Sequence, residues 1–260
     1  MVKILVIGDS CLDVYVYCKT NRFCPDAPVP ILKPESYVST RGMAGNVADN
    51  LRALDIEVDL ISNSNQIKKT RYVDDRTNHM FVRIDEGEND ECMSIDFNED
   101  WQRCIDSDFD LGYDAIVISD YNKGFLTLHD IAHIGKTAKC PTFLDTKKEL
   151  GSWCKDIDYI KINEIELDQS IGFLHDNEEE FSEKVITTLG SKGAQYQGVI
   201  YPVDEVDVRD TSGAGDTFLA GLVYAYITGK NIKNAIKFAN KCATQIVQKK
   251  GTAKIKILEL

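Results

Sequence analysis

The chain has 260 residues, of which 43% are hydrophobic and 28% charged, a composition typical of a globular protein with a sizeable core. Its formal net charge of −12 argues against binding to nucleic acid or to an anionic membrane surface. The N-terminal apolar run is shorter than that of a signal peptide, no segment reaches the length of a membrane span, and the eight cysteines include no Cys-x-x-Cys pair. We therefore expect a cytoplasmic protein with reduced thiols and neither a nucleic-acid nor a membrane partner.

Strand patterns dominate the first third of the chain. The apolar run "KILVIG" at 3–8 is typical of a buried strand in a parallel sheet, and "DVYVYC" at 13–18 alternates like a second strand. The proline-dense segment 24–34 can be neither a central strand nor a helix interior. Helical spacing of Val47, Leu51 and Leu54 then precedes a strand-like run at 57–62, and two further β-like runs, 70–75 and 79–86, predict a hairpin.

Three more buried strands are predicted at 114–120, 141–145 and 158–163, with helical patterns between them. Strands that alternate with helices indicate an α/β fold, with a doubly wound, mostly parallel sheet flanked by helices. The β-rich stretches at about 13–38 and 70–86 do not fit this alternation, so we expect them to form a small β-sheet lid within a single domain spanning 1–260. Ligands bind beyond the carboxyl ends of such strands. Polar residues end four of the apolar runs: Asp9, Asp120, Asp145 and Asn163.

The stretch "DTSGAGDTF" at 210–218 stands directly before an apolar helical pattern. Asp216 falls at the expected N-cap position, where its side chain could simply cap the helix. Alternatively, the backbone N–H groups of Gly213, Ala214 and Gly215 could form an anion hole at the helix N-terminus. The chain has no Walker A motif, and the dinucleotide fingerprint fails because Phe218 stands at its third glycine position.

Four other motifs accompany this stretch in a fixed order: "GMAGN" at 42–46, "NEIE" at 163–166, "TLGSKG" at 188–193 and "KKGT" at 249–252. With them the chain resembles the ribokinase (PfkB) family of carbohydrate kinases. Within that family it is most similar to the heptose 7-phosphate kinases, through "RFCPDAPVP" at 22–30, "SDYNKG" at 119–124, "DTKK" at 145–148 and "KINEIE" at 161–166. The resemblance implies a ribokinase-like fold and ATP-dependent phosphorylation of a sugar or sugar phosphate.

The resemblance also assigns roles to the glycine-rich stretch. Asp216 matches the base that accepts the proton of the attacking hydroxyl, and Gly213, Ala214 and Gly215 match the anion hole. Because a helix N-terminus favours negative charge, we expect Asp216 to be ionised and only weakly basic.

On the nucleotide side, Asn163 and Glu166 match a motif that organises Mg²⁺ and the triphosphate through water, although the same pair could simply cap a helix. The turn at 188–193 could likewise be an ordinary surface turn. ATP and Mg²⁺ are the implied cofactors. Whether a monovalent cation also binds is left open by the resemblance. The further residues expected to contact the nucleotide are Thr188, Gly190, Gly193, Asp210 and Gly251.

On the sugar side, Asp13 matches the acceptor of the sugar hydroxyls, while Gly42 and Asn46 match a sugar-binding turn. Met43 stands where the family usually has a second glycine, so a side chain there could narrow the sugar pocket. A phosphate already present on the sugar would need cations. Arg41, Lys123 and Lys147 are candidates, and each is equally plausible as an ordinary surface charge.

Two alternatives remain at this point: a kinase of an unphosphorylated sugar or a nucleoside, and a non-catalytic sugar- or nucleotide-binding protein on the same fold. A dehydrogenase is disfavoured by the failed glycine fingerprint. The resemblance further implies a homodimer formed through the lid. Compared with the family, the chain is short after residue 62 and between 166 and 188, and it ends near the kinase boundary, so we expect no nucleotidyltransferase domain of the kind fused to some heptose kinases.

Overall fold

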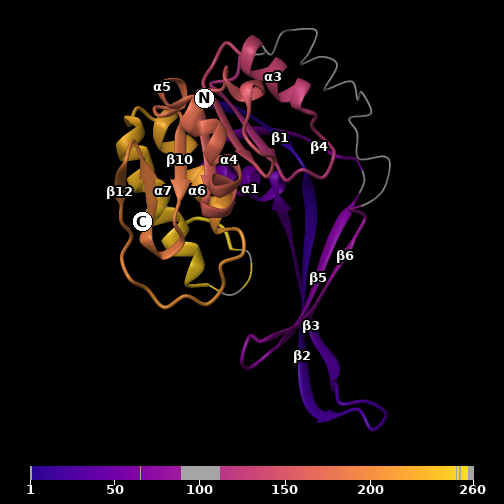
Figure 1. Cartoon of the computed structure of the whole chain (residues 1–260). Helices are drawn as coiled ribbons and strands as arrows, with labels where there is room; N and C mark the ends of the chain where they lie inside the picture. Colours follow the sequence, from indigo (N-terminus) through magenta and orange to yellow (C-terminus); the bar gives the residue numbers. More distant parts are fainter. Residues whose placement is uncertain (1, 65, 89–111, 250, 252, 257–260) are drawn as a thin grey trace.

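The computed structural model describes residues 2–64, 66–88, 112–249, 251 and 253–256 (Figure 1). An eight-stranded sheet runs through the body of the molecule in the order β12-β11-β10-β9-β8-β7-β1-β4. From β4 to β10 neighbouring strands are parallel, and β11 and β12 add an antiparallel edge. The strands are β1 (Lys3–Gly8), β4 (Glu57–Ser62), β7 (Ala115–Asp120), β8 (Thr142–Thr146), β9 (Tyr159–Asn163), β10 (Val185–Thr188), β11 (Ala194–Tyr196) and β12 (Val199–Tyr201).

Helices cover both faces of this sheet, as the alternating pattern predicted. Along β1, Ile4 and Val6 point into a core shared with α1, α6 and α7, whereas Leu5 and Ile7 point into a second core with α3 and the segments around it. Burying such a side chain contributes about 1.5–3 kcal/mol, so the central strands hold both layers together. The helices are α1 (Ala44–Ala53), α3 (Leu128–Thr137), α4 (Glu164–Asp176), α5 (Glu178–Phe181), α6 (Ala214–Ile227) and α7 (Ile232–Val247), with short 3₁₀ turns η2 (Ser152–Cys154) and η3 (Gly190–Lys192).

A separate four-stranded sheet, here called the lid sheet, extends from the body as a twisted arm (Figure 1). Its order is β3-β2-β5-β6, with β2 antiparallel to β3 and parallel to β5. The predicted small sheet and the predicted hairpin are therefore confirmed. Pro30 and Pro34 lie in β3, an edge strand, where a missing backbone N–H does not interrupt the sheet. The strands are β2 (Ser10–Phe23), β3 (Pro30–Met43), β5 (Ile67–Asp74) and β6 (Met80–Glu86).

The order of the strands determines where a ligand can bind. β1 pairs with β4 on one side and with β7 on the other, so the direction of winding reverses at β1. The crevice at such a reversal lies beyond the carboxyl ends of the strands. The chain leaves the body twice to form the lid sheet, through β2–β3 directly after β1 and through β5–β6 shortly after β4. Both departures lie at this same end of the sheet. No helix in the described ranges is both long and apolar enough to cross a membrane.

Candidate active site

The glycine-rich stretch forms the start of α6. Gly213 is the N-cap and has the left-handed φ of 77° that this turn requires and that glycine adopts freely. Asp216 is therefore the third residue of the helix, and the prediction that it is the N-cap was wrong. The N–H of Ala214 donates to the carbonyl of Thr211 at 3.2 Å. The N-terminus of α6 and the Asp216 carboxylate thus lie within one helical turn of each other.

Two side chains from distant segments hold the Asp216 carboxylate. Nδ2 of Asn46, in α1, donates to Oδ2 at 2.9 Å, and the hydroxyl of Tyr121, directly after β7, donates to Oδ1 at 2.7 Å. Asp216 is only 3% exposed. These contacts bring together Asn46, predicted for the sugar-binding turn, and Asp216, the predicted base. They add Tyr121, which lies in the motif at 119–124 but had no predicted role.

Burial changes the acidity of Asp216. It raises the pKa of the carboxyl group to about 6, although the hydrogen bonds from Asn46 and Tyr121 lower it. The prediction of a weakly basic carboxylate was therefore wrong, because removal from water outweighs the helix N-terminus and both hydrogen bonds. At neutral pH Asp216 is still mostly ionised, and it accepts a proton more readily than an ordinary aspartate.

A buried ion pair lies against the glycine-rich turn. Lys161 of β9 and Asp145 of β8 meet with 2.8 Å between Nζ and Oδ2, and they are 4% and 1% exposed. A side chain at Gly215 would place its Cβ 3.0 Å from Nζ of Lys161, so the ammonium group lies next to the start of α6. Oδ1 of Asp145 is buried without a hydrogen-bond partner among the described residues. A lysine inside the apolar run of β9 was the signal that could have revealed this residue.

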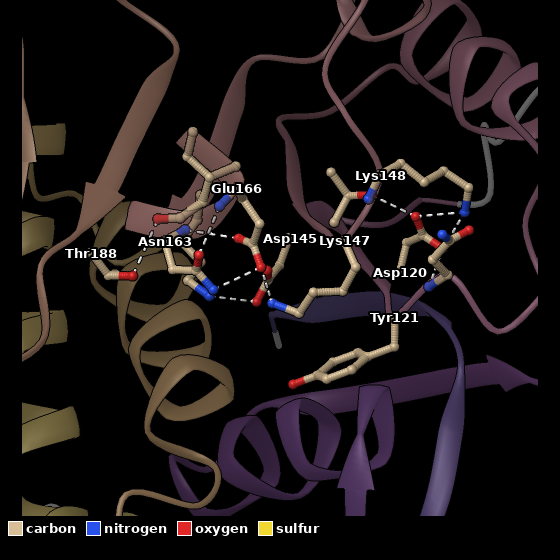
Figure 2. A network of polar contacts seen from close by, with 12 residues as sticks. Asp120, Tyr121, Asp145, Lys147, Lys148, Asn163, Glu166 and Thr188 are labelled. Atoms are coloured by element: carbon tan, nitrogen blue, oxygen red, sulfur yellow. Dashed lines mark hydrogen bonds and ion pairs between the residues drawn. The ribbon is translucent and has the colours of Figure 1, made fainter. Parts of the chain in front are cut away.

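The cap at the start of α4 contains two more predicted residues. Asn163 and Glu166 form a capping box, in which each side chain accepts a hydrogen bond from the backbone N–H of the other. The pair is therefore a helix cap, as the simpler interpretation predicted. The cap also holds the Glu166 carboxylate at the carboxyl end of β9. Lys147 forms an ion pair with Glu166 and lies over the ring of Tyr121, with Nζ 5.3 Å from the ring centroid (Figure 2).

Lys147 links this cap to Asp216. Burial lowers the pKa of Lys147, but the carboxylates of Asp145, Glu166 and Asp216 together raise it above its ordinary value. The charged ammonium group is therefore held among three carboxylates. Of the three cations predicted for a substrate phosphate, Lys147 is the one that this structure joins to the Asp216 group.

On the lid side, Asp13 of β2 pairs with Arg71 of β5. Gly42 lies opposite Cys11 and beside Asp13, and a Cβ there would lie 2.3 Å from Oδ2 of Asp13, so a side chain at this position would displace the Asp13 carboxylate. Lys69 precedes Arg71 by two residues and points to the same face of β5. Neither cation was predicted from the sequence, although their alternation in "KKTRYV" could have indicated them.

The other two predicted cations have partners of their own. Lys123 pairs with Glu88 at 2.8 Å, and Lys69 approaches the same carboxylate at 3.5 Å. Arg41 pairs with Asp49 of α1, whose carboxylate also meets Arg52 and Lys254.

The remaining predicted residues lie around α7 and the β10–β11 turn. Asp210 accepts hydrogen bonds from the N–H groups of Ser212 at 2.8 Å and Gly251 at 3.1 Å, which joins two of the sequence motifs. Lys250 and Thr252 of the second motif lie outside the described residues. Thr188 ends β10, where its hydroxyl donates to the carbonyl of Ile162 at 3.2 Å.

A cavity of about 870 Å³ opens between α7 and the segment that leads to Asp210. Its walls are formed by Tyr201 to Asp204 and Val206 on one side and by the polar face of α7 on the other. The turn from Gly190 to Gly193 abuts this wall, because a side chain at Gly193 would lie 2.1 Å from the carbonyl oxygen of Tyr201. The predicted nucleotide turn and the cavity are therefore neighbours.

The chain is similar to known proteins in both sequence and structure. The chain is 31% identical to the bifunctional protein HldE of Nitratiruptor sp. and 27% identical to that of Histophilus somni, in each case over 99% of its length. It spans 64% and 62% of the length of these relatives.

Among solved structures, the chain resembles phosphofructokinase-2 from Escherichia coli in complex with potassium, with a TM-score of 0.73 and 16% identity over 99% of this chain and 96% of that chain. It also resembles ribokinase from Thermotoga maritima, with a TM-score of 0.68 and 18% identity over 97% and 95% of the two chains. These likenesses confirm the predicted ribokinase-like fold. Residues 46–257 match the model of the pfkB family of carbohydrate kinases, and the chain therefore belongs to that family.

Proposed function

We propose that this chain is a cytoplasmic ATP-dependent kinase that transfers the γ-phosphoryl group to a hydroxyl of a sugar phosphate of the heptose 7-phosphate class. The observation that carries the proposal is the buried Asp216, whose pKa of about 6 suits proton acceptance, at the N-terminus of α6. The HldE relatives support the choice of a heptose phosphate.

In this proposal Asp216 takes the proton of the attacking hydroxyl, while Asn46 and Tyr121 hold the carboxylate in place. One donor reaches each oxygen, and a carboxylate oxygen can accept more than one hydrogen bond, so Asp216 keeps room for the sugar hydroxyl. The N-terminus of α6 and the ammonium group of Lys161 stabilise the negative charge on the transferred phosphoryl group.

The acidic groups beyond β8 and β9 fit a magnesium-bound triphosphate. Glu166 offers a fixed carboxylate, and Asp145 has one buried oxygen without a partner among the described residues, which suits metal-bound water. Asn163 and Glu166 would hold Mg²⁺ through such water, and the ion would neutralise charge on the phosphates. We assign the adenine ring of ATP to the cavity beside α7, and the phosphates of ATP to the path past Asp210 and Gly213.

The phosphate of the substrate would meet cations on the lid side. Lys69 and Arg71 project from one face of β5, and Lys123 approaches the same carboxylate as Lys69. Arg71 can bind a phosphate with two parallel hydrogen bonds, which makes it the strongest candidate. We therefore add Lys69 and Arg71 to Lys123 and Lys147 as candidates. We rank Arg41 last because it lies opposite Leu12, on the other face of the lid sheet from Asp13, Lys69 and Arg71.

An unphosphorylated sugar or a nucleoside is the second candidate substrate. One observation favours it: each cation named above already has a carboxylate partner, so a substrate phosphate has to compete with Asp13, Glu88 or Glu166. Preference for a free sugar over its phosphate in a substrate panel would favour this candidate.

A second copy of the chain is the partner proposed for the lid sheet. Tyr37 of β3 and Val82 of β6 lie in one row across the sheet, through Val16 and Tyr72, and both remain exposed. Ile84 lies two residues beyond Val82 on the same face and is also exposed. A second lid sheet of the same composition would cover this apolar face.

The proposal is tested by coupled ADP release with Mg-ATP across a panel of sugars and sugar phosphates that includes heptose 7-phosphate. Asp216→Asn serves as the control. Turnover that depends on a sugar phosphate and is lost in the variant would support the proposal. Bound ATP without turnover on any sugar would instead favour a binding protein.

A further inference from the structure

Met43 has a backbone conformation that side chains rarely adopt. Its φ is 58° and its ψ is −135°, close to a region that is essentially reserved for glycine. Holding another residue there costs about 1–3 kcal/mol, so the surrounding structure must stabilise it. Met43 is nonetheless only 3% exposed, and its side chain makes no compensating cap bond to α1.

The Met43 side chain belongs to a small apolar cluster beside the site. Met43, Cys11 and Ile67 pack together at the base of the lid sheet, and Tyr121 packs against this cluster. The same Tyr121 donates its hydroxyl hydrogen bond to Asp216. The packing therefore supports one of the two side chains that hold the Asp216 carboxylate.

The Met43 backbone supports Asn46, the other side chain that holds the Asp216 carboxylate. Met43 is the N-cap of α1, and the third residue of that helix is Asn46, which donates to the second oxygen of Asp216. Both donors to Asp216 thus depend on one residue, Asn46 through the start of the helix and Tyr121 through packing.

We propose that Met43 is a positioning residue: its side chain holds the ring of Tyr121 so that the hydroxyl meets Asp216. This inference rests on the proposed role of Asp216 as the base. Glycine at position 43 would keep the helix start, because it adopts this backbone without strain, but it would remove one of the three side chains of the cluster against which Tyr121 packs. Met43 therefore couples the packing at the base of the lid sheet to the basicity of the carboxylate.

Several groups besides Tyr121 face Asp216 or act on it electrostatically. Burial is the largest influence and raises the pKa of Asp216; the hydrogen bonds from Asn46 and Tyr121 and the charge of Lys161 lower it, and Asp145 raises it further. Asp216 in turn raises the pKa values of Cys11 and Lys147. Since the hydrogen bond from Tyr121 lowers the pKa of Asp216, weakening that bond should raise it.

The test compares the pH dependence of kcat/KM in the wild type, Met43→Gly, Tyr121→Phe and the double variant. We expect both single variants to move the acidic limb to higher pH and to lower kcat about tenfold, the usual cost of one charge-assisted hydrogen bond. The double variant should lose no more than either single variant, because both changes remove the same contact. Met43→Leu keeps the side-chain volume and should restore a nearly wild-type profile.

Gln197→Gly is the matched control. Gln197 also has a positive φ, 50°, but it lies exposed in the turn between β11 and β12. Glycine there relieves a positive φ without touching the site, so the pH profile should not move. An unchanged profile in Met43→Gly would overturn the inference while leaving the proposed function intact.

A crystal structure of Met43→Gly separates the two claims. If the wild type turns over no sugar, the proposed function fails, but the position of Tyr121 still tests the inference. A Tyr121 hydroxyl that has moved away from Asp216 would support it. A hydroxyl still within hydrogen-bond distance of Asp216 would overturn it whatever the activity.

Discussion

Tyr121 donates a hydrogen bond to Asp216, with 2.7 Å between its hydroxyl oxygen and Oδ1. The two residues stand 95 positions apart, one directly after β7 and the other in the first turn of α6. Burial, and then the neighbouring carboxylates, raise the pKa of Tyr121 well above its ordinary value. The phenol therefore stays neutral and keeps the proton that it donates to Asp216. Through this bond the body of the sheet lowers the pKa of the carboxylate on α6, against the larger effect of burial.

The pH dependence of catalysis should follow Asp216. Its pKa is raised to about 6, so kcat/KM should fall as the pH drops through this value and the carboxylate is protonated. A pH–rate profile measured with saturating ATP checks this. An acidic limb centred near pH 4, the range of an ordinary aspartate, would contradict the assignment of Asp216 as the base.

Asp216→Asn should lose activity and gain stability. Loss of a general base typically costs about 10²- to 10⁴-fold in rate. In the folded chain the pKa of Asp216 lies above its ordinary 3.8, so the folded state binds more protons and the free energy of unfolding falls as the pH rises through about 4 to 6. Asparagine removes this penalty, and the variant should be more stable at pH 8 by about 3 kcal/mol, the equivalent of a shift of roughly two pKa units.

Urea unfolding of both proteins at pH 8 and pH 4 measures that difference. The gain should shrink at pH 4, where the wild-type carboxyl is largely protonated in the folded state. A variant that is equally stable or less stable at pH 8 would show that the buried charge is not costly.

Lys161→Met should reduce both activity and stability. Removing one partner of a buried ion pair leaves the Asp145 carboxylate without the ammonium group that it contacts directly, at a cost of about 3–5 kcal/mol. Adding Asp145→Asn should restore much of the melting temperature, since the uncompensated charge is gone. Activity should stay low in the double variant, because the ammonium group beside Gly215 is still missing. Full recovery of kcat in the double variant would mean that Lys161 has only a structural role.

Arg71→Ala should raise KM for a sugar phosphate about 10- to 100-fold, the value of a charge-assisted hydrogen bond. The KM of the corresponding free sugar should change little. Arg41→Ala is the matched control, because its partner is Asp49 and its side chain is half-exposed. Equal effects of Arg71→Ala on both sugars would argue against a phosphate contact.

The lid sheet should mediate self-association. Val82→Lys places a charge in the exposed apolar row with Tyr37, and it should convert a dimer to a monomer in analytical ultracentrifugation. Val199→Lys changes an equally exposed valine on β12 of the other sheet and should leave the dimer intact. A wild-type chain that sediments as a monomer would refute the proposed dimer.

The sequence predicted the strands that are buried on both faces. β1, β7, β8 and β9 are short, continuous apolar runs. This pattern can be recognised in the sequence without knowing which strands lie beside each other. β10, β11 and β12 escaped prediction because they have only three or four residues and a partly exposed surface. The lid sheet was foreseen because its two β-rich stretches interrupt the alternation of strands and helices.

The sequence indicates residues of the candidate site but not the contacts between them. Motif order located Asp216, Asn163 and Glu166, and the cap at α4 followed from local spacing. The acidity of Asp216 could not be predicted, because it depends on burial beneath segments far away in the chain. The same limit applied to the cations, since the acid that pairs with Arg71 is 58 residues away.

The most direct test is ³¹P NMR of the wild-type protein incubated with Mg-ATP and heptose 7-phosphate. We predict a second phosphomonoester or glycosyl phosphate resonance that grows as the γ-phosphate signal of ATP decays, and its absence in Asp216→Asn. Decay of ATP to ADP and inorganic phosphate with no new sugar phosphate signal would contradict transfer to this substrate.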